Sequence, residues 1–219
     1  MFWYVNLLIF PSRELIVLAS SAIIDDIDAM RKAGLVSLAY FYYDFREQKT
    51  GLRGLLSSML VQLSHQSDSY HDVLFKFYSK HVREIRPPSD SALVECLKDM
   101  LKHSQLPPVY LVVDALDECP SIPAVRSPRS KVLDLIVELN NSQFPNLRIC
   151  VTSRLETDIK DVFDPLIPRH LSLHDEKGQK GDIEEYIKSV IDEHPESGSW
   201  KEEHKQLVID VLTEKADGM

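Results

Sequence analysis

The sequence predicts an α/β fold in which a mostly parallel sheet is covered by helices on both faces. Short runs rich in β-branched and aromatic residues alternate with longer segments whose apolar residues recur every three or four positions. That alternation is typical of parallel strands joined by helices. The run VYLVV at 109–113 lacks a polar face, which favours a strand buried on both sides. With 219 residues, 44% hydrophobic and 27% charged, the chain can bury one sizeable core.

The first half of the chain is predicted to form one helix, one strand and three further helices. The first helix covers 17–33 and ends at Gly34, and the β-forming run LVSLAYFYYDF predicts a strand near 36–43. The last of the three helices begins after a Pro-Pro pair with Ser89 as its N-cap. The apolar faces of the four helices are Ile23, Ile24, Ile27 and Met30; Leu56, Met59, Leu60 and Leu63; Tyr70, Val73, Leu74 and Phe77; and Leu93, Val94, Leu97 and Leu101.

The second half continues the alternation. VYLVVDA is the next strand, a helix follows the loop at 120–130, and LRICVTSR at 147–154 is a second short buried strand. A short helix near 156–163, a strand at 170–173 and a helix containing Ile183, Tyr186, Ile187 and Val190 come next. The final helix has an apolar face of Leu207, Val208, Val211 and Leu212 with little sequence after it to cover that face. Either this helix folds back on the sheet or its partner lies in residues absent from this sequence, and we expect a fragment of a longer protein.

The N-terminal segment MFWYVNLLIF is apolar but short. No positive charge precedes it and Pro11 ends it, so it falls below the roughly 20 residues that span a bilayer and argues against a membrane anchor. Two interpretations stay open, a buried first strand and a foreign lead-in sequence.

Charge and cysteine content restrict the partners and the compartment. The net charge is −9 and the basic residues are scattered, which argues against a nucleic-acid surface. Three cysteines without a C-x-x-C pair favour a reducing compartment, and we expect a cytoplasmic protein.

Polar residues follow the two central strand patterns where each strand ends. Asp114, Asp117 and Glu118 follow the strand at 109–113, and the carboxyl ends of parallel strands are where open α/β sheets bind ligands. Asp114 at such a position could ligate Mg²⁺ beside phosphate oxygens, the Walker B arrangement. The alternative is a solvated turn or a helix cap.

The neighbouring strand ends in Thr152, Ser153 and Arg154. These residues could face a γ-phosphate next to the metal. The alternative for Arg154 is a surface ion pair with Glu156 or Asp158.

Several separate segments in order resemble the NACHT domain of fungal-type signal-transduction NTPases, of the nephrocystin-3-like N-terminal type. They are AYFYYDFREQKTGLRGLLSSMLVQL, PVYLVVDALDECP, LRICVTSR, SLHDEKGQKGDIEEYI and the terminal ADGM. The resemblance implies a three-layer P-loop NTPase core whose five strands have the order 5-1-4-3-2. It divides the chain into a divergent segment (1–16), a core (17–178) and the truncated start of a helical region (179–219).

The resemblance also implies roles for the residues at the strand ends. Asp114 would coordinate Mg²⁺, Asp117 or Glu118 would activate water, and Arg154, with Ser153, would bind the γ-phosphate of ATP or GTP. The resemblance further implies a molecular switch, in which nucleotide binding and hydrolysis change the protein between a closed and an open, often oligomeric, state. Protein partners or self-association are therefore expected.

The phosphate-binding loop of that family is missing. A P-loop needs G-x-x-x-x-G-K-[ST], whose backbone amides and lysine hold the phosphates. Here the Lys and Ser/Thr positions fall on Leu15 and Ile16, and the glycines on Ser12, Arg13 and Glu14 or nearby. We therefore expect impaired nucleotide binding, with a non-catalytic protein-interaction module as the alternative function. A catalytic role for Cys119 is disfavoured, since the neighbouring acids would raise the pKa of its thiol.

Overall fold

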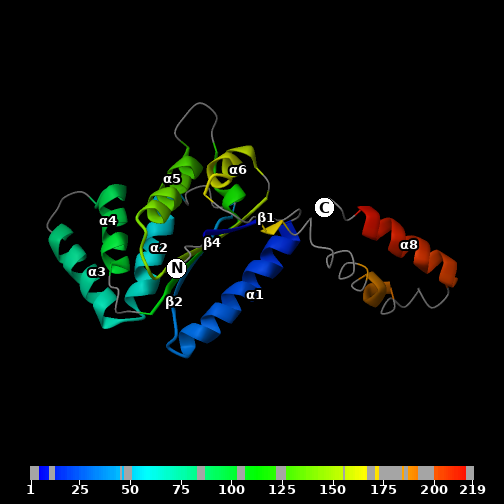
Figure 1. Cartoon of the computed structure of the whole chain (residues 1–219), viewed down its shortest axis with the longest axis horizontal. Coiled ribbons are helices and arrows are strands. Elements are labelled where there is room, and N and C mark those ends of the chain that lie inside the picture. The colour runs from blue at the N-terminus through cyan, green and yellow to red at the C-terminus, as the bar shows by residue number, and fades with distance from the viewer. Residues whose placement is uncertain are drawn as a thin grey trace.

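The computed structural model describes residues 5–9, 13–44, 46, 51–82, 87–102, 107–121, 127–154, 156–166, 171–172, 184, 187–191 and 200–215. Within them, a parallel sheet lies between helices on its two faces (Figure 1). The terminal ADGM and most of the segment SLHDEKGQKGDIEEYI lie outside the described residues, as do Ile183 and Tyr186 of the helix expected there. The α/β class with a parallel sheet is confirmed.

The sheet contains β1 (Val5–Ile9), β2 (Ser37–Tyr42), β3 (Val109–Asp114), β4 (Leu147–Ser153) and β5 (Leu171–Ser172), in the order β2-β3-β4-β1-β5. Read from β5, this is the order 5-1-4-3-2, and each strand pair is parallel. The edge strands are β2 and β5, and β3, β4 and β1 lie between them. Strand β5 contributes only two residues. The long β3 and β4 pairing brings the ends of those two strands together.

The N-terminal apolar segment contributes a strand to this sheet. Residues of β1 pair with β4 from Val5 opposite Ile149 to Ile9 opposite Ser153. Of the two interpretations of this segment, the first strand is therefore the one the structure contains. Helix α1 (Arg13–Lys32) begins four residues earlier than expected, so three residues, 10–12, separate β1 from α1.

The helices are α2 (Leu52–Ser64), α3 (Asp68–His81), α4 (Asp90–Leu101), α5 (Pro128–Asn141), α6 (Thr157–Phe163) and α8 (Glu202–Lys215). Serine caps explain where three of them begin. The Ser67 hydroxyl accepts from the Ser69 amide at the start of α3. The Ser89 hydroxyl accepts from the Ala92 amide at the start of α4, as predicted, and Ser127 accepts from the Ser130 amide before Pro128 opens α5.

Two apolar clusters occupy the two faces of the sheet. The smaller lies under α1 and contains Ile24, Ile27, Val36, Leu38 and Val112. The larger packs α2, α4 and α5 against the other face, and Leu55, Leu97 and Val151 are among its fully buried members. This burial is the main contribution to stability, because each buried aliphatic side chain contributes about 1.5–3 kcal/mol.

Helix α8 keeps an exposed apolar face. Three residues of the predicted face, Leu207, Val211 and Leu212, are exposed. The fourth, Val208, is half-buried, and Ile209 is buried. Figure 1 shows α8 at the opposite end of the molecule from α3 and α4. In the described part of the chain, every helix is too short or too polar to cross a bilayer.

Candidate functional site

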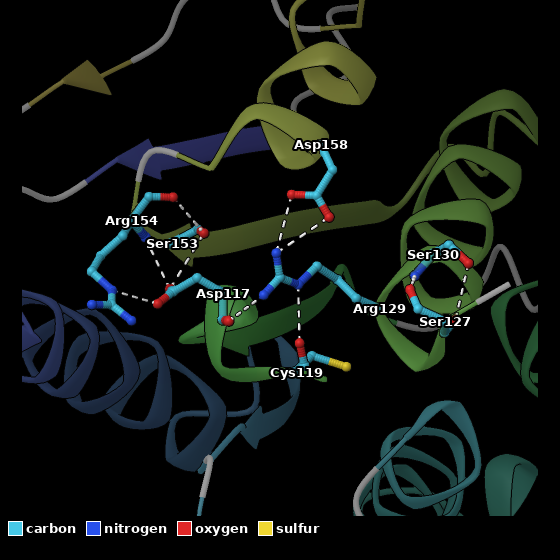
Figure 2. Close-up of polar contacts among 8 residues, drawn as sticks. All are labelled: Asp117, Cys119, Ser127, Arg129, Ser130, Ser153, Arg154 and Asp158. Atoms are coloured by element: carbon cyan, nitrogen blue, oxygen red, sulfur yellow. Dashed lines mark hydrogen bonds and ion pairs between the residues drawn. The ribbon is translucent and has the colours of Figure 1, made fainter. Parts of the chain in front are cut away.

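The parallel pairing of β3 with β4 creates the candidate site. Val113 lies opposite Val151 in the ladder, so Asp114 and Thr152, one residue further along each strand, emerge side by side at the carboxyl edge. The 3-10 turn η1 (Leu116–Glu118) follows β3 and carries the remaining two acids. The structure thus brings the strand-end residues of two segments nearly 40 positions apart into one cluster (Figure 2).

Asp114 is buried rather than exposed to solvent. Only 3% of the residue is exposed, and its Oδ1 accepts a hydrogen bond from the Thr152 hydroxyl. The Thr152 oxygen in turn accepts from the Ala115 amide at 3.0 Å. Burial raises the pKa of Asp114, and hydrogen bonds from Thr152 and from Ser20 of α1 partly oppose that rise. The alternative considered for these acids, a solvated turn, does not describe Asp114, which is buried.

Ala115 turns the chain so that Asp117 points back toward Ser153 and Arg154 at the end of β4. Its φ of 53° and ψ of 48° are left-handed, a conformation that costs a non-glycine residue about 1–2 kcal/mol. Hydrogen bonds on both sides of Ala115 stabilise it. Its amide donates to Thr152, and its carbonyl accepts from the Glu118 amide at 2.9 Å. The strained residue is therefore part of how the cluster is assembled.

Asp117 and Arg154 form an ion pair across the site. Arg154 donates from Nε to Oδ2 of Asp117 at 2.6 Å and from its backbone amide to Oδ1 at 2.9 Å (Figure 2). The Asp117 side chain is 1% exposed and that of Arg154 is 49% exposed. The hydrogen bond with Asp117 raises the pKa of the Arg154 guanidinium further above its ordinary value. The ion pairs considered for Arg154 with Glu156 or Asp158 are replaced by this one.

The other two predicted site residues lie close by. Ser153 is buried, and its hydroxyl lies 2.8 Å from the Arg154 carbonyl and 3.4 Å from Oδ1 of Asp117. Glu118 is half-buried at the end of η1. All five predicted residues are therefore neighbours in the structure.

Arg129 is the residue that the sequence reasoning missed. It lies in the first turn of α5 and is only 8% exposed, yet it carries a full charge. Its Nε donates to the Cys119 carbonyl at 3.0 Å and its Nη2 to the Asp117 carbonyl at 2.5 Å. Its Nη1 contacts both carboxylate oxygens of Asp158 in α6, at 3.1 and 3.2 Å. One side chain thus fastens η1 to two helices (Figure 2).

No local pattern identifies Arg129 in advance, because a basic residue just inside a helix is common and usually solvated. The Cys119 thiol next to this network is buried, and burial disfavours the thiolate that reacts as a nucleophile. Burial raises the pKa of Cys119 to about 11, as was expected of a thiol in these surroundings, although the main cause is burial rather than the neighbouring acids. The three cysteines are free.

In this structure the strand-end side chains contact one another, and the first turn of α1 lacks the residues of a phosphate-binding loop. Asp114 is buried against Thr152, and Asp117 and Arg154 neutralise each other. Leu15 and Ile16 fall in the first turn of α1, where a P-loop would place its lysine and hydroxyl.

Comparisons with known proteins place the chain in a family. The search of curated proteins found no match. Among solved structures, the ORC2 protein of Aeropyrum pernix in its ADP form is similar with a TM-score of 0.46 and 13% identity, covering 99% of this chain and 54% of that one. This chain therefore spans about half the length of that structure. The family model described as nephrocystin 3, N-terminal, matches residues 17–154, which include most of α1, all of β2, β3 and β4, and the cluster of acids. The chain belongs to the nephrocystin 3 N-terminal family.

Proposed function

We propose that this chain is a NACHT-type signalling domain that keeps an NTPase-like fold as a scaffold and binds nucleoside triphosphates weakly or not at all. The observation that carries the proposal is the Asp117–Arg154 ion pair. In the family-like arrangement, the acid would activate water and the arginine would bind phosphate. Here each satisfies the other, so both would have to separate before either could bind a ligand.

The missing phosphate cradle supports the same conclusion. Three residues separate β1 from α1, which is fewer than the glycine-rich loop needs to surround a phosphate. Losing two charge-assisted contacts, at about 1.5–3 kcal/mol each, weakens binding by roughly a hundredfold or more. Under this proposal the described acids and arginine stabilise the sheet edge instead of a nucleotide.

The scaffold role requires protein partners. The exposed Leu207, Val211 and Leu212 of α8 support a protein contact or self-association, because exposed apolar groups of this kind commonly mark interaction surfaces. We propose a cytoplasmic setting without a nucleic-acid partner, in keeping with the acidic net charge of −9.

The test is equilibrium binding of fluorescent ATP and GTP analogues to the whole chain, with and without Mg²⁺. We expect no saturable binding below millimolar concentrations, and no change after Arg154→Ala or Asp114→Ala. Arg148→Ala is the matched control, because Arg148 lies near the amino end of the same strand, away from the cluster.

A second variant makes the result interpretable in both directions. Replacing 9–16 with a loop of the form G-x-x-x-x-G-K-S should restore binding if the missing cradle is the cause. Micromolar affinity of the unmodified chain, lost in Arg154→Ala and kept in Arg148→Ala, would overturn the proposal and make Arg154 a phosphate ligand.

A further inference from the structure

Strand β2 lies at the edge of the sheet and would ordinarily expose unpaired backbone groups. In its parallel ladder with β3, alternate residues face the partner strand; the Ser37 amide, for example, donates to Pro108 at 2.8 Å. Leu38 and Tyr40 therefore direct their amides and carbonyls away from β3. Such an edge is a template for pairing with a strand of another chain.

Two glutamines of α2 occupy these edge groups. Gln66 accepts from the Leu38 amide at 2.9 Å and donates to the Leu38 carbonyl at 2.6 Å. Gln62 does the same for Tyr40, at 3.0 and 2.7 Å. Each side-chain amide thus makes the two hydrogen bonds that a hydrogen-bonded residue of an antiparallel neighbouring strand would make through its own N–H and C=O.

The spacing explains why one helix can serve two strand residues. Positions four apart on a helix are separated by about 6 Å along its axis, and positions two apart on a strand by about 6.6 Å. Gln66 therefore lies at Leu38 and Gln62 at Tyr40, which means that the helix runs antiparallel to the strand. Additional donations from Gln62 to the Ser58 hydroxyl at 2.9 Å and from Gln66 to the Gln62 carbonyl at 2.8 Å hold both amides in place.

The sequence of β2 makes an open edge hazardous. SLAYFY contains no charge, no proline and no glycine, which is the composition of segments that add strand to strand. The Tyr40 and Tyr42 rings are exposed and lie in edge-to-face contact with centroids 5.4 Å apart. They offer an apolar surface beside the edge, so a second copy of β2 is the strand that would complement it about a twofold axis.

We propose that Gln62 and Gln66 guard the β2 edge against strand addition by a second copy of this chain. Any self-association of the intact protein consequently uses another surface. The guard is separate from the β3–β4 cluster, so this inference does not depend on the proposed function.

Amide hydrogen exchange of the whole chain tests the geometry directly. In Gln62→Ala/Gln66→Ala, the Leu38 and Tyr40 amides should exchange roughly five- to tenfold faster in dilute solution, because each loses its acceptor. The Ala39 amide belongs to the β3 ladder and should keep its protection, which confirms that the variant is folded. Equal exchange at Leu38 and Tyr40 in both proteins would overturn the proposed contacts.

Sedimentation velocity tests the consequence. The double alanine variant should associate at concentrations at least tenfold lower than the unmodified chain. In Gln62→Glu/Gln66→Glu the donors to the carbonyls are lost but charges lie at the edge, which opposes strand pairing, so this variant should not gain association. Adding Tyr40→Lys to the alanine variant should reverse its association for the same reason. The proposal would be refuted if the alanine variant associated no more strongly than the unmodified chain. It would also be refuted if the glutamate variant associated as strongly as the alanine variant.

Discussion

Arg129→Met is the substitution that examines the site network most directly. Methionine keeps an unbranched apolar stem in the first turn of α5 but removes every donor of the guanidinium. The Cys119 and Asp117 carbonyls then lose the hydrogen bonds that Arg129 makes to them. Because these carbonyls sit in a buried region, the loss is a desolvation penalty as well as a missing contact.

The expected magnitude follows from these contacts. Leaving a buried acceptor unsatisfied costs about 1–3 kcal/mol, and two carbonyls are affected. The ion pair with Asp158 adds less than about 1 kcal/mol, since Asp158 is 45% exposed and its charge is screened by solvent. The sum, reduced by the apolar burial of methionine, is about 2–5 kcal/mol, a large part of the 5–15 kcal/mol typical of a folded domain.

Urea unfolding followed by circular dichroism measures this change. With a slope of about 2–3 kcal/mol per molar urea, the unfolding midpoint of Arg129→Met should fall by about 1–2 M. Asp158→Asn should cost less than about 1 kcal/mol. Arg148→Met is the matched control, because among the described residues the Arg148 guanidinium donates to the carbonyls of Pro145, before β4, and Leu147, at its start. A free energy of unfolding for Arg129→Met within about 0.5 kcal/mol of the original, the range of ordinary surface substitutions, would refute the reasoning.

Three further expectations follow from burial. Because burial raises the pKa of Asp114 above its ordinary value of 3.8, the folded state holds that proton more tightly than the unfolded state, and the free energy of unfolding falls as the pH rises above 3.8. Asp114→Asn should therefore be at least as stable as the original at about pH 8 and gain nothing below pH 3.8, which melting curves across pH would check; lower stability at pH 8 would contradict it. Thiol titration should find no disulfide and slow native labelling, because burial raises the pKa to about 11 for Cys96, Cys119 and Cys150; rapid labelling near neutral pH would contradict this. Leu97→Ala, in the core, should cost about 2–5 kcal/mol in urea unfolding, whereas Leu207→Ser, on the exposed face of α8, should stay within about 0.5 kcal/mol; similar losses would show that α8 is covered.

Much of the fold could be predicted because its signals are local. The run VYLVVD, whose first five residues have no polar face, becomes β3. Ser89 caps α4 by accepting a hydrogen bond from the amide of Ala92, three residues later. Residues that determine such elements are adjacent in the chain, so periodicity and capping reveal them. Element boundaries are harder to predict. Helix α1 begins at Arg13 instead of 17, because a helix start without a clear cap has no sharp sequence signal.

The sequence predicts which residues gather at the candidate site but not which of them contact one another. Asp114, Asp117, Glu118, Ser153 and Arg154 do lie together, because parallel strands end at the same edge. Their proposed roles toward metal and phosphate stay predictions. That Asp117 binds Arg154, and that Asp114 is buried against Thr152, depends on side-chain contacts between β3 and β4 that no spacing within either segment specifies.

The sequence by itself determined which segments become strands and helices, that they alternate in a parallel α/β protein, and which polar residues follow the central strands. These properties depend on backbone preference and on apolar periodicity over a few neighbouring residues. Only the tertiary structure decided that Arg129 joins η1 to α5 and α6, that Asp117 and Arg154 neutralise each other, and that α2 covers the β2 edge with Gln62 and Gln66. A charged or amide side chain finds its partner by where the packed elements place it, and packing is set by the whole core.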